Sequence, residues 1–148
     1  VTQLLNKTNQ MNLSTRRLTE PELRSWASAP GHALWAFRLV DKFEDAGLTG
    51  IVSLECDDDE ARIVDFVLSC RVIGRQLEEA MLYQAAHYAS RRGLKTLSAE
   101  YIPTPKNAPC LRFLERSGFE NGNGHSFRWN LNRPYAPPRH VELRGLAE

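Results

Sequence analysis

The sequence predicts an α/β (α+β) domain with a single mixed central sheet flanked by helices. Apolar runs with the length of strands alternate with amphipathic segments of helical period, a pattern typical of such sheets. The chain has 148 residues, of which 42% are hydrophobic, so it is long enough for one domain with its own core. No internal repeat or low-complexity segment interrupts this pattern.

The first half of the chain predicts two helices and four strands. Leu4 and Leu5 give residues 2–9 an apolar side, and a second helix starts after Thr19 and ends before Pro30. Glu22 stands three residues after Thr19, the spacing of a capping box. The expected strands are residues 13–18, 33–40, 48–55 and 61–68, with a polar turn at 41–47 and an acidic, solvated hairpin tip at 57–60.

The second half begins with the clearest helix of the sequence. Apolar and small residues recur at spacings of three and four from Leu77 to Tyr88, and Gly93 follows as a stop signal. A strand is expected at 94–101, a helix at 107–117 that stops at Gly118, and a last strand at 125–131. Residues 132–148 are rich in Pro and Arg, so we expect a domain over 1–131 and a C-terminal tail over 132–148.

Composition narrows the function classes. The net charge of +1 does not favour a nucleic-acid partner, and no apolar run approaches the ~20 residues of a membrane span. The three cysteines are an odd number without C-x-x-C spacing, which indicates reduced thiols and a cytoplasmic location. No metal site is predicted. The first residue is Val, which indicates an excised fragment.

The stretch at 70–76, Cys-Arg-Val-Ile-Gly-Arg-Gln, lies between a predicted strand and a predicted helix, where backbone N–H groups can bind a phosphate. It resembles the pyrophosphate loop Q/R-x-x-G-x-G/A of the GCN5-related N-acetyltransferase (GNAT) superfamily. Arg71 and Gly74 match, whereas Gln76 departs from the last small position. The resemblance implies a GNAT fold and cofactor contacts by Arg71, Val72, Gly74, Arg75 and Gln76.

A second stretch, 107–119, resembles the superfamily pattern N-x-x-A-x-x-x-Y-x-x-x-G-F. Asn107, Gly118 and Phe119 match, and Leu114 replaces the Tyr that often serves as general acid. The resemblance implies that Asn107 meets a pantetheine arm in a slot between two splayed central strands. The implied cofactor is coenzyme A or carrier-protein phosphopantetheine. The amides of its pantetheine arm can pair with the strand edge, and the strand amides can polarise the carbonyl of the thioester that it carries.

Three stretches, residues 3–17, 68–74 and 100–107, are together similar to the C-terminal half of FkbH-like proteins. Those proteins join a HAD-phosphatase-like domain to a GNAT-like domain and load a glyceryl unit from 1,3-bisphosphoglycerate onto an acyl carrier protein for polyketide-type biosynthesis. The resemblance implies an acyl carrier protein as partner. It also implies a HAD-like phosphatase domain or chain. The polar block Asn9, Asn12, Thr15 and Arg16 falls within this resemblance without a mechanism of its own.

Four side chains are candidate catalytic groups. Cys70 stands beside Arg71 and a helix N-terminus, which favour a thiolate that accepts an acyl group; the alternative is a small residue that fills the end of the strand. Asp65 interrupts an apolar strand on the face expected for Ile63, so it is either a base or paired with an arginine. Glu100 and Tyr101 end the neighbouring strand, where they line the acyl end of the slot or face water.

Two further functions stay open. One is a plain acetyl-CoA-dependent N-acetyltransferase that acts on a small amine. The other is a non-catalytic module that docks a carrier protein for a HAD-type partner, which the loss of the Tyr and the presence of Gln76 favour.

Overall fold

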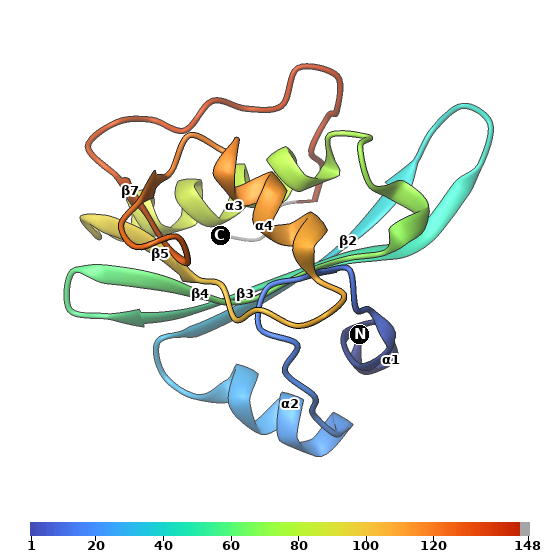
Figure 1. Ribbon diagram of the computed structural model, residues 1–148, viewed down its shortest axis with the longest axis horizontal. Helices are drawn as coiled ribbons and strands as arrows, with labels where there is room; N and C mark the ends of the chain where they lie inside the picture. The colour runs from blue at the N-terminus through green and yellow to red at the C-terminus, as the bar shows by residue number, and fades with distance from the viewer. Residues whose placement is uncertain (146–148) are drawn as a thin grey trace.

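A computed structural model describes residues 1–145 and confirms the mixed sheet flanked by helices (Figure 1). The elements are α1 (Thr2–Lys7), β1 (Met11–Asn12), α2 (Glu20–Ser28), β2 (His32–Val40), β3 (Asp45–Asp57), β4 (Glu60–Leu68), a short 3-10 helix (Cys70–Val72), α3 (Leu77–Arg91), β5 (Thr96–Glu100), α4 (Ala108–Glu115), β6 (Glu120–Asn121) and β7 (Ser126–Asn130). Within the described residues no helix is long and apolar enough to cross a membrane.

The sheet has the strand order β2-β3-β4-β5-β7-β6, and β1 pairs with β4 beside this path. Strands β2, β3 and β4 are antiparallel neighbours, whereas β4 and β5 run parallel. Because α3 is the crossover between the two parallel strands, the turn before α3 lies at the C-terminal end of β4. This topology places the predicted phosphate loop beside the junction of the two halves of the sheet.

Helices cover both faces of the sheet (Figure 1). On one face, α3 and α4 bury the larger core, in which Met81 and Phe113 are among the fully buried side chains. On the other face, α1 and α2 contribute Leu5 and Leu23 to a smaller cluster with Ile51 of β3 and Val67 of β4. Central strands β3 and β4 are therefore apolar on both faces, which explains why they read as nearly continuous apolar runs.

Local sequence signals account for the helix boundaries. The Thr19 hydroxyl accepts from the Glu22 N–H while the Glu22 carboxylate accepts from the Thr19 N–H, which confirms the predicted capping box. Helix α3 buries the predicted face, and Gly93 follows it at φ 77°, a conformation that favours glycine.

The strand predicted at 13–18 is wrong. Strand β1 is the dipeptide Met11–Asn12, and the chain turns directly after it. The Asn12 side chain accepts from the Thr15 N–H, and Thr15 has a φ of 53°, so the extended conformation cannot continue. Strand β6 was not expected from the sequence, since it has only two residues. Strand β3 begins at Asp45, before the predicted start at 48, because the Asp41 carboxylate accepts from the N–H groups of Phe43 and Glu44 and so closes a tight hairpin tip.

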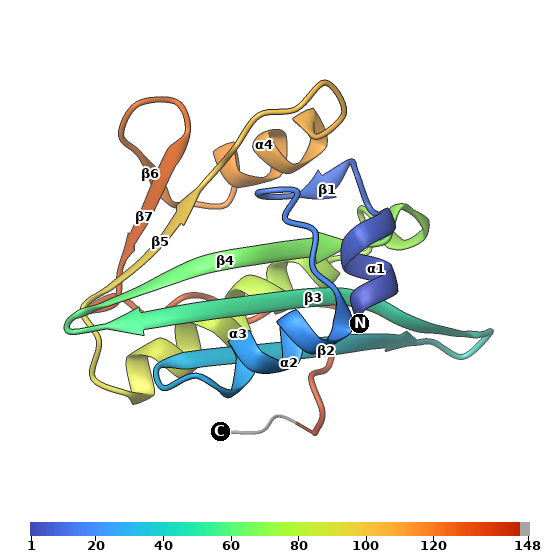
Figure 2. The same ribbon diagram turned by 90° about the horizontal axis from the view of Figure 1, so that it is seen from below.

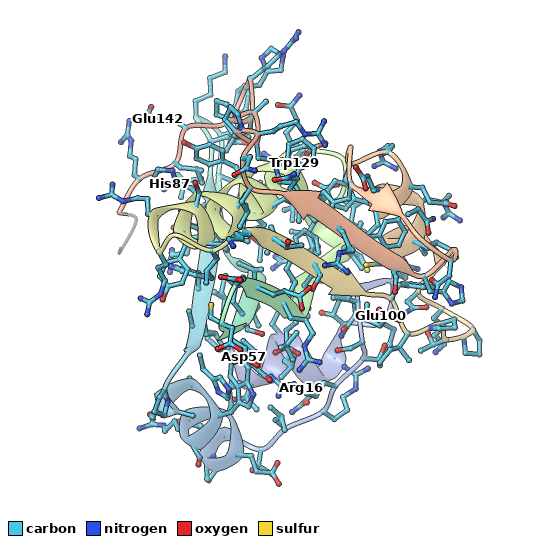
Figure 3. All side chains as sticks on the ribbon, turned by 90° about the vertical axis from the view of Figure 1, so that its left-hand side faces the viewer. Arg16, Asp57, His87, Glu100, Trp129 and Glu142 are labelled. Carbon is cyan, nitrogen blue, oxygen red and sulfur yellow. The ribbon has the colours of Figure 1, made fainter. Side chains whose placement is uncertain are left out.

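Residues 132–145 contain no helix or strand, yet they lie against α3 and β2. Tyr135, Val141 and Leu143 pack on the larger core, and the Tyr135 hydroxyl donates to the Ser117 carbonyl over 2.7 Å. Trp129 of β7 lies under the start of this segment, where its Nε1 donates to the Arg133 carbonyl (Figure 3). The rest of the predicted tail, 146–148, lies outside the described residues, and the division into domain and tail stays a prediction.

Candidate functional site

Strands β4 and β5 separate halfway along β4. Their parallel pairing ends at Ile63 with Ala99, although β4 continues to Leu68. At the same point the partner of Ser53 is Asp65 while the partner of Leu54 is Ile63, so Val64 is an extra, bulged residue. The bulge bends β4 and frees its edge toward β5. The splayed strands implied by the resemblance are therefore present.

The space beside the freed edge is filled by the chain itself. Residues Met11 and Asn12 pair with Leu68 and Val67, and the Leu13 N–H donates to the Phe66 carbonyl over 3.1 Å. Figure 2 shows β1 between β4 and the connection that leads from β5 to α4. An open slot for pantetheine, as the sequence predicted, is therefore not what the structure shows.

Asn107 lies on the far side of this segment, in the connection to α4. Its Oδ1 accepts from the Tyr101 hydroxyl and from the Thr104 N–H, both over 2.7 Å. Its Nδ2 donates to the carbonyls of Asn12 (3.0 Å) and Ile102 (2.9 Å). An asparagine side chain can make these four hydrogen bonds and few more. Asn107 is fully buried and binds the protein's own backbone, and its predicted contact with a pantetheine arm stays a prediction.

Tyr101 belongs to the same cluster, because its hydroxyl proton is committed to Asn107. Burial raises the pKa of Tyr101 above its usual value, so the phenol is neutral near pH 7. Glu100, the preceding residue, points elsewhere: it is exposed at the end of β5, and its carboxylate accepts from the Ser126 hydroxyl over 2.6 Å (Figure 3). The structure thus brings Tyr101, but not Glu100, to the splay.

Asp65 faces α1 and α2 rather than the face of Ile63, because the Val64 bulge breaks the alternation that the sequence suggested. Both of its carboxylate oxygens accept from the guanidinium of Arg16, and Oδ2 also accepts from the Ser53 hydroxyl. The Arg16 guanidinium in turn stacks over the Trp26 ring at 4.6 Å. Asp65 is therefore paired with an arginine, the structural alternative that the sequence left open, and is not placed as a base.

The loop at 70–76 forms the expected tight turn into α3, but its amides are partly used. The N–H of Val72 donates to the Ser69 carbonyl, and that of Arg75 donates to the Val72 carbonyl. The N–H of Gly74 donates to the Glu78 carboxylate over 3.0 Å. These three amides do not point freely toward solvent, which corrects the expectation for Val72, Gly74 and Arg75.

Side chains of the loop also have internal partners. The Arg71 guanidinium is exposed and donates to the Ser69 hydroxyl and the Ala46 carbonyl, each over 3.3 Å. Arg75 pairs with the Asp41 carboxylate of the β2–β3 hairpin. Arg75 is thus already paired with a carboxylate, whereas Arg71 makes only two long contacts and remains available to an anion.

Gln76, which stands where the motif has a small residue, has both a left-handed backbone conformation and a side-chain partner. It has a φ of 64°, in the left-handed region where the family carries a small residue. Its side-chain oxygen accepts from the His140 N–H over 3.1 Å, so it ties the C-terminal segment to the loop. The Gln76 side chain thus links two segments of the chain, and its predicted contact with a phosphate stays a prediction.

Glu78 was not singled out from the sequence, although the positive end of the helix dipole favours a carboxylate in the first turn of a helix. The side chain is 1% exposed, Oε2 accepts from Gly74, and Oε1 has no hydrogen-bond partner among the described residues. A buried carboxylate therefore occupies the position at the helix N-terminus where a phosphate would be expected.

Cys70 is exposed at the C-terminal end of β4, and its thiol lies 3.5 Å from the Gln10 side-chain oxygen, immediately before β1. The packing alternative for Cys70 is therefore wrong. Cys110 is buried in α4, and burial raises its pKa to about 12. Accessibility leaves Cys70 as the candidate nucleophile nearest the splay.

A separate cavity of about 840 Å³ lies between β2 and the C-terminal segment. Trp35, Leu39, Val141 and Leu143 give it an apolar lining, and Arg75 is the one predicted site residue beside it. This cavity is separate from the slot between β4 and β5, where the sequence predicted acyl transfer.

No protein-family model and no curated protein matches the sequence. The fold, in contrast, matches solved structures. An acetyltransferase of the GNAT family from Desulfovibrio desulfuricans is 20% identical, with a TM-score of 0.61 over 76% of this chain and 77% of that chain. The GNAT domain of S. lividans PAT is 16% identical, with a TM-score of 0.60 over 77% of this chain and 70% of that chain.

The ribosomal-protein-S18-alanine N-acetyltransferase from Escherichia coli is 16% identical, with a TM-score of 0.57 over 86% of this chain and 83% of that chain. Identities this low establish architecture rather than substrate, and the relationship to FkbH-like proteins stays a prediction. The splayed parallel pair, the bulge in β4 and the tight turn into α3 are the features seen here, and the chain has the GNAT fold.

Proposed function

We propose that the chain is an acyltransferase domain that binds a phosphopantetheine thioester along the freed edge of β4. The observation that carries this is the splay itself: β4 leaves β5 at the Val64 bulge, and the turn into α3 lies at the same end of the strand. A strand edge offers alternating N–H and C=O groups to the amides of a pantetheine arm. Arg71 supplies the positive charge for its phosphate.

The acyl group and acceptor follow from the resemblance to FkbH-like proteins. We propose a glyceryl-type acyl group and the thiol of an acyl carrier protein as its acceptor, with a HAD-like domain or chain that supplies the phosphate chemistry. Leu114 is 1% exposed and cannot donate a proton where related enzymes often carry Tyr. A thiolate leaving group needs no such proton near neutral pH, so thiol-to-thiol transfer suits this site better than transfer to an amine.

The proposed transfer takes place in two thioester exchanges, with Cys70 as the nucleophile of the first. The Cys70 thiolate attacks the thioester carbonyl, a C–S bond forms to Cys70, and the C–S bond to pantetheine breaks with release of its thiolate. The carrier-protein thiolate then attacks the Cys70 thioester and releases Cys70. Exposure of Cys70 at the end of β4 makes this route sterically open.

Intact-mass measurement of both proteins tests the proposal. The chain is incubated with a glyceryl thioester of pantetheine and a holo acyl carrier protein. Acyl mass should appear on the chain, then on the carrier, and Cys70→Ser should abolish the first step. Cys56→Ser is the matched control, because Cys56 lies at the far end of the sheet, next to the β3–β4 hairpin. Transfer that is unaffected by Cys70→Ser would refute the covalent route.

Acetyl-CoA-dependent N-acetylation is a second candidate, favoured by the fold match to an N-acetyltransferase from Escherichia coli. It predicts turnover of acetyl-CoA with small amines in the absence of any carrier protein. Release of free coenzyme A in an amine panel distinguishes it from carrier loading.

A non-catalytic carrier-docking module is a third candidate. The occupied slot favours it, since Asn107 and the edge of β4 already bind residues Asn12 and Leu13. It predicts carrier binding by calorimetry without acyl transfer to the chain or to the carrier.

A further inference from the structure

We propose that residues 10–14 are a displaceable occupant of the thioester site, and that phosphopantetheine binds only after this segment leaves β4. The inference rests on the proposed function, because it concerns the regulation of the same site. Strand β1 then acts as an internal competitor, held in place until a thioester or a partner replaces it.

Backbone contacts of the segment are those that an extended ligand would make. Met11 and Asn12 pair antiparallel with Leu68 and Val67, and the Leu13 N–H donates to the Phe66 carbonyl. On the opposite side the Leu13 carbonyl accepts from the Ile102 N–H over 3.0 Å. The segment therefore bridges the two diverging halves of the sheet.

Side-chain contacts complete the occupation. The Ser14 hydroxyl donates over 3.0 Å to the carbonyl of Val64, the bulged residue. The Asn107 side-chain amide donates one of its two N–H groups to the Asn12 carbonyl. Met11 and Leu13 are each 1% exposed, so the segment also fills the core beside α4. A ligand at this edge cannot share the edge with the segment, since the same backbone groups are already bonded.

The occupied state carries a local strain at its C-terminal end. Thr15 has a φ of 53°, which is unfavourable for a β-branched residue, and its Oγ1 is buried without a hydrogen-bond partner among the described residues. Both features lower the stability of the docked segment relative to the released one. A segment that is well packed at Met11 and Leu13 but strained at Thr15 is suited to exchange with a competing ligand.

The loop proposed to bind the phosphate is also occupied by a group of the chain itself. The N–H of Gly74 donates to the buried Glu78 carboxylate, whose Oε1 has no partner among the described residues. An internal carboxylate here stands in for an anionic ligand, as β1 stands in for the pantetheine arm. Both parts of the site are thus filled by the chain when no thioester is bound.

A reversible lock tests the inference. Asn12 and Val67 are directly opposite and lie between the hydrogen-bonded positions of the pair, where cross-strand Cα atoms are close enough for a disulfide. We would combine Asn12→Cys and Val67→Cys in a Cys70→Ser background and measure binding of acetyl-coenzyme A, which has no free thiol to open the disulfide, by calorimetry. The oxidised protein should bind at least ~10-fold more weakly than the same protein after reduction, and equal affinities would overturn the inference.

Two single variants test it without a disulfide. Thr15→Gly removes the backbone strain of the docked segment and should weaken coenzyme A binding by about 5–10-fold. Ser14→Ala removes the bond to Val64 and should strengthen binding by a similar factor. Identical affinity in both variants and the wild type would refute the displacement alone, whereas absence of coenzyme A binding in every variant would refute the thioester site and thus the proposed function as well.

Hydrogen exchange gives a readout on the unmodified chain. Coenzyme A should accelerate exchange of the Leu13 amide, because displacement breaks its bond to the Phe66 carbonyl. Slower exchange of that amide upon coenzyme A binding would show that the ligand binds with the segment in place, and would contradict the inference.

Discussion

Arg16 and Asp65 are 49 residues apart in the chain, and two guanidinium nitrogens of Arg16 donate to the two carboxylate oxygens of Asp65. The Asp65 side chain is fully buried, whereas Arg16 is 23% exposed. Removal of the arginine alone leaves a buried charge without a counterion. We expect Arg16→Met to lower the free energy of unfolding by about 3–5 kcal/mol in urea denaturation.

Arg24→Met is the matched control for that change. Arg24 pairs with Glu20 on the surface of α2, where both side chains are mostly exposed, so its loss should cost below about 1 kcal/mol. Equal costs for the two substitutions would show that the Arg16–Asp65 pair does not matter for the stability of the fold.

Tyr135 makes stability depend on alkaline pH. Burial, with a smaller contribution from the Glu79 carboxylate, raises the pKa of Tyr135 from 10.0 to about 12. A raised pKa means that folding favours the neutral phenol, so its stabilisation is complete below pH 10 and is lost as pH rises to 12. The neutral hydroxyl donates to the Ser117 carbonyl, which contributes about 1 kcal/mol. The wild type should therefore be more stable than Tyr135→Phe at pH 8 and lose this advantage by about pH 12.

The three cysteines should react with iodoacetamide at very different rates. Cys70 is exposed, Cys56 is partly buried, and Cys110 is fully buried. Burial raises the pKa of both Cys56 and Cys110, which lowers their thiolate fraction. At pH 8 we expect Cys70 to be alkylated at least ~10-fold faster than the other two, as peptide mass spectrometry would measure. Comparable rates for Cys56 would exclude a special accessibility of Cys70.

Glu78 should weaken anion binding at the loop. Glu78→Gln keeps the shape of the side chain but removes the negative charge beside the Gly74 N–H. Affinity for coenzyme A should rise about 5–10-fold, while the free energy of unfolding falls by about 1 kcal/mol because a charged acceptor is lost at the helix N-terminus. Glu79→Gln removes the same charge from the same turn without touching Gly74, so it should raise affinity less. A larger effect at Glu79 would point to general electrostatics instead.

Much of the fold is predictable because its signals are local. The capping box at Thr19 and Glu22, the helical period of α3 and the stop at Gly93 each depend on residues within a few positions of one another. The same holds for the tight turn after β4. These features follow from the sequence without knowledge of the tertiary structure.

The site was less predictable because its contacts are long-range. Nothing near Asp65 in the sequence indicates that Val64 is bulged, yet that single extra residue turns Asp65 toward Arg16 and away from the face of Ile63. Pairing of β1 with β4 joins residues about 55 positions apart, and a dipeptide strand has no periodicity to detect. The side-chain bonds of Asn107 to the carbonyls of Asn12 and Ile102 could not be read from the sequence either, because they depend on where β1 lies.

Strand β1 also has a consequence for solubility. Where β4 leaves β5, the edge from Val64 to Leu68 would otherwise present unpaired backbone groups beside a strongly apolar strand, the kind of edge that pairs with other chains. Residues Met11 to Ser14 cap that edge. Any ligand or partner that removes them must cover the same groups, because a bare edge would recruit a second copy of the chain and begin aggregation.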